Sequence, residues 1–188
     1  MVWPQKASAH PLSPQSDINI VGPKEGFSPQ IGTLVSMMNW MRRVILLPVH
    51  GMSIKDLDYL LDDNANSIGA MLWHLAASER FYQIHTFEGR KWGNWDQAEK
   101  EEWSIASGLG DEARKTIKGY PLEFYLEKLV RVREHSLKEF AKRDDSWLME
   151  VDEKWFWGPT NNYCKWFHIC EHESNHNGQI KLIKGRLS

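Results

Sequence analysis

Three histidines recur at every fourth position near the C-terminal end of the chain, at His168, His172 and His176. Residues four apart lie on one face of a helix, because each residue turns the chain by about 100°. Imidazole is the commonest protein ligand for zinc and related transition metals, and two imidazoles at this spacing can bind one ion. The spacing therefore predicts a metal site on a C-terminal helix.

The segment from His172 to His176 also spells His-Glu-x-x-His, a motif of many metalloproteases. Those enzymes need another ligand further along the chain, yet no Asp, Glu or His follows His176. The longer protease signature fails as well, because Gln179 and Leu182 occupy the positions of its glycine and its third histidine. The sequence therefore argues against a peptidase.

Glu173 is the carboxylate that this segment offers for catalysis, as a general base. It lies about 100° round the helix from His172. This offset favours a position in solvent or behind the metal ligands over a direct part in the reaction.

Two ligands from one helix do not complete a metal site, so a third must come from a facing helix. His74 is the best candidate, since it lies about 60° from Met71 on the shoulder of the apolar face of another predicted helix. The face that carries His172 also carries Ile169 and Gln179 and is expected to point inward. A buried stripe of imidazoles is costly unless its nitrogens are satisfied, and a metal ion satisfies several at once.

The elements that must position these residues are all predicted to be helical. Apolar periodicity, capping residues and prolines indicate four main helices, at residues 28–47, 66–89, 121–144 and from after 159 to 185. Short helical pieces are expected after Ser53 and within the loop 90–119, and no segment alternates like a strand. We therefore predict an all-α protein, an antiparallel four-helix bundle with short extra helices in its loops.

Residues 1–27 are rich in proline and glycine and show little periodicity, so we expect an extended N-terminal arm before a single domain at 28–188. The net charge of −2 gives no basic surface for nucleic acid. No run reaches the roughly 18 apolar residues of a membrane span, and the N-terminus lacks the apolar core of a signal peptide. With only two cysteines, which form no disulfide framework, the expected location is the cytoplasm.

At 10 tryptophans, the chain is unusually rich in this residue, which suggests a bulky core or the lining of a pocket. Trp155 and Trp157 either wall a pocket mouth or belong to ordinary packing.

Two segments resemble the DinB-like four-helix-bundle family. They are Ser67 to Ala76, which contains His74, and His168 to Ile180, with three histidines spaced by four followed by Gly178-Gln179-hydrophobic. The resemblance covers about residues 28–186. It implies a divalent metal, zinc or nickel, held by His74, His172 and His176. Gln179 is a candidate for supporting these ligands, and His168, one turn before His172, is expected to support them or to be a ligand itself. It also implies a homodimer. Asn177 departs from the family pattern, where a basic residue is common.

Three neutral imidazoles leave a divalent ion with its full charge and an open position, which is the pattern of catalytic sites. Such an ion lowers the pKa of bound water or of a bound thiol. Because some DinB-like relatives use low-molecular-weight thiols, the resemblance favours transfer of such a thiol to a small electrophile. The alternatives are a metal-dependent hydrolase of a small ester or amide, and a non-catalytic metal-binding bundle for stress response or interaction.

Overall fold

The structure is a computed structural model that describes residues 17–187. Most of the predicted N-terminal arm, residues 1–16, lies outside the described residues. The elements are α1 (Pro29–Leu46), α2 (Ile54–Leu57), α3 (Ile68–Thr86), α4 (Gln97–Gly108), α5 (Gly110–Thr116), α6 (Leu122–Phe140), α7 (Asp145–Met149), β1 (Val151–Asp152), β2 (Thr160–Asn161) and α8 (Asn162–Lys184). None of the helices within 17–187 has the length and apolar character needed to cross a membrane.

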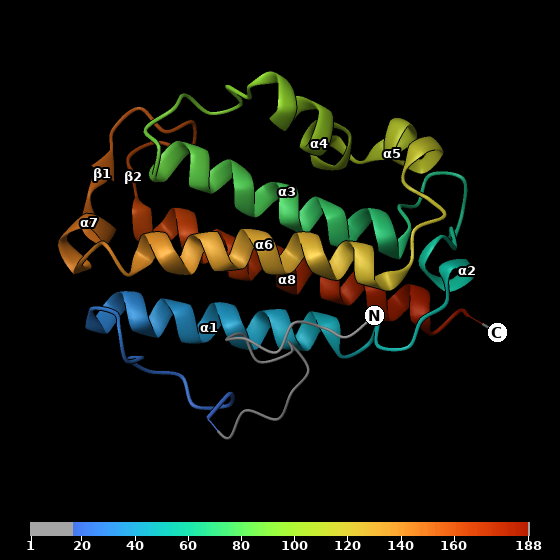
Figure 1. The fold of residues 1–188 in the computed structure, drawn as a ribbon, viewed down its shortest axis with the longest axis horizontal. Helices are drawn as coiled ribbons and strands as arrows, with labels where there is room; N and C mark the ends of the chain where they lie inside the picture. Colours follow the sequence, from blue (N-terminus) through green and yellow to red (C-terminus); the bar gives the residue numbers. More distant parts are fainter. Residues whose placement is uncertain (1–16, 188) are drawn as a thin grey trace.

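The four long helices α1, α3, α6 and α8 lie side by side in one bundle (Figure 1). The predicted all-α bundle with short helices in its loops is therefore confirmed. The two-residue strands β1 and β2 pair as a small antiparallel hairpin that the sequence analysis did not predict. The hairpin encloses residues 153–159.

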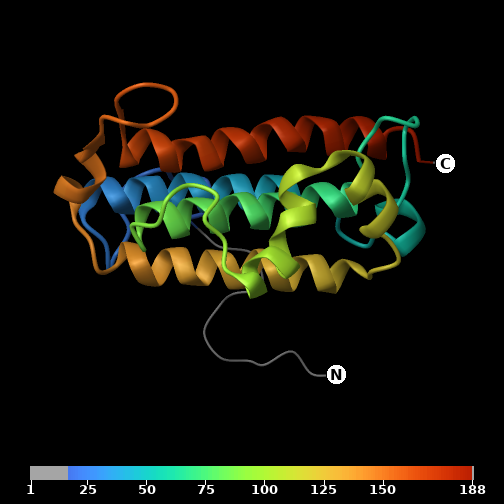
Figure 2. The same cartoon turned by 90° about the horizontal axis from the view of Figure 1, so that it is seen from above.

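Helix direction differs from the prediction of an antiparallel bundle. α3 and α8 are antiparallel neighbours, but α1 runs the same way as α8, and α3 the same way as α6 (Figures 1 and 2). The reason is the connection between α3 and α6, in which α4 and α5 carry the chain back along the bundle. A crossover of this length allows two parallel helices to pack together.

The start of α1 shows how distant parts of the chain complete a local signal. Ser28 precedes the helix and Pro29 begins it, but the Ser28 side chain does not cap the helix. Instead Oδ1 of Asp145 accepts hydrogen bonds from the backbone N–H groups of Gln30 (3.0 Å) and Ile31 (3.2 Å) and from the Ser28 hydroxyl (2.5 Å). Asp145, the first residue of α7, therefore caps the N-terminal end of α1.

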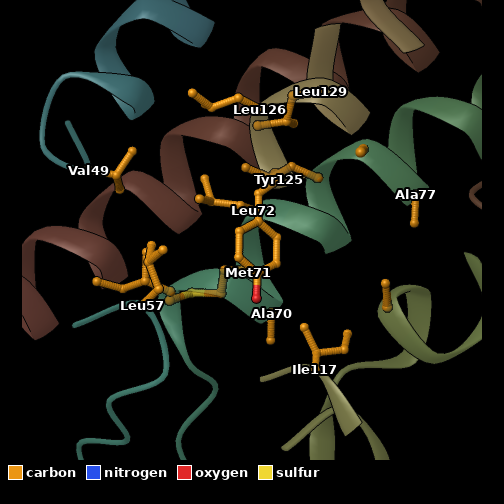
Figure 3. Close-up of a cluster of buried hydrophobic side chains, with 14 of the residues drawn as sticks. Val49, Leu57, Ala70, Met71, Leu72, Ala77, Ile117, Tyr125, Leu126 and Leu129 are labelled. Atoms are coloured by element: carbon orange, nitrogen blue, oxygen red, sulfur yellow. The ribbon is translucent and has the colours of Figure 1, made fainter. Parts of the chain in front are cut away.

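One apolar cluster packs between α3 and α6 around Tyr125 (Figure 3). The Tyr125 ring lies so close to α3 that a Cβ on Gly69 would meet its hydroxyl oxygen at 2.5 Å. Glycine at this position allows the two parallel helices to approach. A second cluster at the other end of the bundle centres on the fully buried Trp166 and Phe140. The two clusters fix the register of α3 against α6 and α8.

Candidate metal centre

His74, His172 and His176 meet between α3 and α8, as the sequence analysis expected. Nε2 of His172 lies 3.0 Å from Nε2 of His74 and 3.1 Å from Nε2 of His176. The ligand atoms of the three residues all lie within 4.8 Å of one another. Within residues 17–187, this is the one group of three or more potential ligands that converges in this way.

Hydrogen bonds on the far side of two rings set their tautomers. Nδ1–H of His74 donates to the carbonyl oxygen of Ala106 at 2.9 Å, and Nδ1–H of His176 donates to Oε1 of Gln179 at 3.1 Å. Both rings therefore turn an Nε2 lone pair towards His172. Such outer partners orient metal-binding imidazoles in known sites. Gln179 was named in the sequence analysis as a candidate supporting residue, whereas a backbone carbonyl such as that of Ala106 leaves no signal in the sequence.

The three rings are neutral at pH 7. Burial, reinforced by the nearby His176, lowers the pKa of His74 to about 4. Burial together with His74, His176 and His168 lowers the pKa of His172 to about 3. Burial also lowers the pKa of His176. Only the neutral imidazole offers a lone pair to a metal, so the site keeps its ligands in the form that binds.

The arrangement of nitrogens fits a divalent cation. A neutral His172 carries a single proton, so it can satisfy only one of the two lone pairs that face it. Its Nδ1 is buried without a hydrogen-bond partner among the residues described. Nitrogens bound tetrahedrally to zinc at about 2.0–2.1 Å lie roughly 3.3 Å apart, close to the 3.0 and 3.1 Å that separate Nε2 of His172 from Nε2 of His74 and of His176. A cation at their centre would satisfy all three lone pairs together.

His168 lies beside this group rather than in it. Its ring stacks on that of His172, with centroids 5.5 Å apart and planes at 17°. The Tyr82 hydroxyl lies 2.9 Å from Nδ1 of His168, and burial lowers the pKa of His168. His168 therefore packs against a candidate ligand and is itself held by α3 through Tyr82. The sequence analysis did not predict this contact with Tyr82.

The sequence analysis favoured a position for Glu173 in solvent or behind the metal ligands, and the first of these is wrong, since its exposed fraction is 1%. Its Oε1 accepts hydrogen bonds from Arg42 at 2.7 and 2.9 Å and from Arg133 at 3.1 Å. Both arginines also bind Glu79 of α3, so each of the four bundle helices contributes one charge. We call Arg42, Glu79, Arg133 and Glu173 the buried quartet.

Burial acts to raise the pKa of Glu79, but the charges of Arg133 and Arg42 outweigh it and hold the pKa below its ordinary value. The sequence analysis missed the quartet. Its signal was a charged residue on an apolar helix face: Glu79 follows Leu72 and Leu75 at intervals of seven and four.

The family described as MST: Mycothiol-S-transferase matches residues 33–188. No curated protein matches the chain. The family match includes both α3 and α8 and therefore the whole histidine group.

Proposed function

This chain belongs to the mycothiol S-transferase family, a DinB-like family, and we propose that it transfers a low-molecular-weight thiol, mycothiol by the family's name, to a small electrophile. The family assignment supports an enzyme. The observation that carries the proposal is the convergence of three neutral imidazoles on one point between α3 and α8.

His74, His172 and His176 would hold one divalent ion, zinc or nickel. When bound, such an ion supplies the positive charge that lowers the pKa of a thiol and favours thiolate at neutral pH. Ala106 and Gln179 keep the Nε2 atoms of two ligands aimed at the centre, and burial keeps protons off the imidazoles. In the reaction the thiol sulfur bonds to the electrophilic carbon, the leaving group departs with its electron pair, and the thiol proton passes to solvent.

The hydrolytic alternative depends on Glu173 as a base. Two arginines from α1 and α6 bind Oε1 of Glu173, and its side chain is 2% exposed, so the carboxylate is already engaged as an ionic partner inside the buried quartet. The thiol-transfer proposal does not need this carboxylate.

Metal content tests the ligand set directly. Elemental analysis of purified protein should find about one zinc or nickel per chain, and His172→Ala should lose it. His50→Ala, at an exposed histidine, is the matched control and should retain the metal. Full metal content in His172→Ala would reject this ligand set.

Thiol dependence tests the reaction. Calorimetric titration should detect mycothiol binding to metal-loaded protein and not to protein stripped by a chelator, and conversion of an alkyl halide should require that thiol. Turnover of esters or amides without thiol would favour the hydrolase. Metal binding with neither thiol binding nor turnover would favour the non-catalytic bundle.

A further inference from the structure

The loop between β1 and β2 presents two large aromatic side chains to solvent. The exposed fraction is 63% for Phe156 and 49% for Trp157. The two rings contact each other, with centroids 5.2 Å apart, and both contact Trp155 behind them. Exposed aromatic groups gathered in this way are typical of a binding surface.

This aromatic loop lies next to the histidine group. The Trp157 ring meets the ring of His168 edge to face, at 5.0 Å and 66°. His168 in turn stacks on His172. One imidazole therefore separates Trp157 from a candidate metal ligand, so a small molecule that reacts at the centre lies within reach of the Trp157 ring.

The base of the loop is held rigidly against α8. Lys165, whose side chain is 2% exposed, donates a hydrogen bond from Nζ to Oδ2 of Asp152 at 2.8 Å. The same ammonium lies 4.4 Å from the centre of the Trp155 ring, an attractive cation–π contact. β1 also pairs with β2 through Val151 and Asp152. These contacts fix the position from which Phe156 and Trp157 project.

From this arrangement we propose that Trp157, assisted by Phe156, contacts the organic body of the electrophile, and that the substrate class is electrophiles carrying an aromatic ring. Flat apolar rings attract other rings at centroid distances of about 4.5–7 Å. The reacting carbon must lie at the sulfur, so the rest of the electrophile must extend from the centre. The inference rests on the proposed thiol transfer and names the substrate class for that site.

Two electrophiles with the same reacting group isolate the contribution of the ring. Iodoacetanilide and iodoacetamide both form a carbon–sulfur bond as iodide leaves with the electron pair of the carbon–iodine bond, and only the first carries an arene. With zinc-loaded protein and mycothiol, Trp157→Ala should lower the ratio of kcat/KM for the anilide over the amide by about 2- to 12-fold, the range of an aromatic contact. Trp157→Phe should retain part of the preference.

Phe167→Ala is the matched control. Phe167 is 50% exposed on α8 and lies about 140° round the helix from His172, so the ratio should not change. Zinc content, which should equal that of the wild type in every variant, excludes damage to the centre. An unchanged ratio in zinc-loaded Trp157→Ala would overturn the inference.

A binding measurement separates this inference from the proposed reaction. Acetanilide cannot react, and saturation-transfer NMR should show that the zinc-loaded wild type binds it more weakly when Trp157 is replaced by Ala. If this binding is found but thiol transfer is absent, the proposed function fails and the aromatic site stands. If thiol transfer is found but acetanilide does not bind, the aromatic site is wrong.

Discussion

Replacing Glu173 by Gln should destabilise the fold rather than remove a catalytic group. The substitution leaves the two buried arginines, Arg42 and Arg133, facing the single carboxylate of Glu79. The side chains of the quartet are at most 8% exposed, so water cannot compensate the uncovered charge. Breaking a buried ion pair by removing one partner costs about 3–5 kcal/mol. For a domain of this size that corresponds to a Tm lower by roughly 6–20 °C.

Urea denaturation and calorimetry of zinc-loaded protein measure this loss. Glu134→Gln, at an exposed position on α6, is the matched control and should stay within about 0.5 kcal/mol of the wild type. Adding Arg42→Met to Glu173→Gln restores charge balance in the quartet. The double variant should therefore lose less stability than the sum of the two single variants.

Activity measured below the lowered Tm then decides the role of Glu173. Thiol transfer per folded molecule should change little, whereas loss of a general base typically costs about 10²–10⁴-fold in rate. A Glu173→Gln protein with the stability of the wild type and a collapsed rate would refute the reasoning and establish the carboxylate as the base.

Two further predictions concern acid stability and assembly. Metal-free protein should lose stability as the pH falls from 6.5 towards 4. Histidines of the unfolded chain take up protons in this range, whereas His74, with a pKa of about 4, and His172, with a pKa of about 3, stay neutral in the fold. Equal urea midpoints at pH 7.5 and 5.0, or a His74→Gln variant whose stability depends on pH as steeply as that of the wild type, would contradict this. The family resemblance and the exposed apolar residues predict a homodimer. Light scattering at micromolar concentrations tests this, and the mass of a single chain at every concentration would count against it.

The sequence by itself determined the main helices and the residues that meet at the centre. Both depend on local periodicity, since spacing by four places His172 and His176 on one face whatever lies around them. The need for a third ligand then pointed to His74 on another helix, and the structure brings the three together. That they bind a metal is still a prediction.

Tertiary structure alone decided the features that depend on contacts between distant segments. The direction of α6 relative to α3 follows from the path of the crossover, which no periodicity encodes. The Ala106 carbonyl that sets the tautomer of His74, and the Asp145 side chain that caps α1, act across 32 and 114–117 residues. The partners of Glu173 come from two other helices. Helical spacing specifies which face a side chain occupies, but its hydrogen bonds and its charge environment depend on what packs against that face.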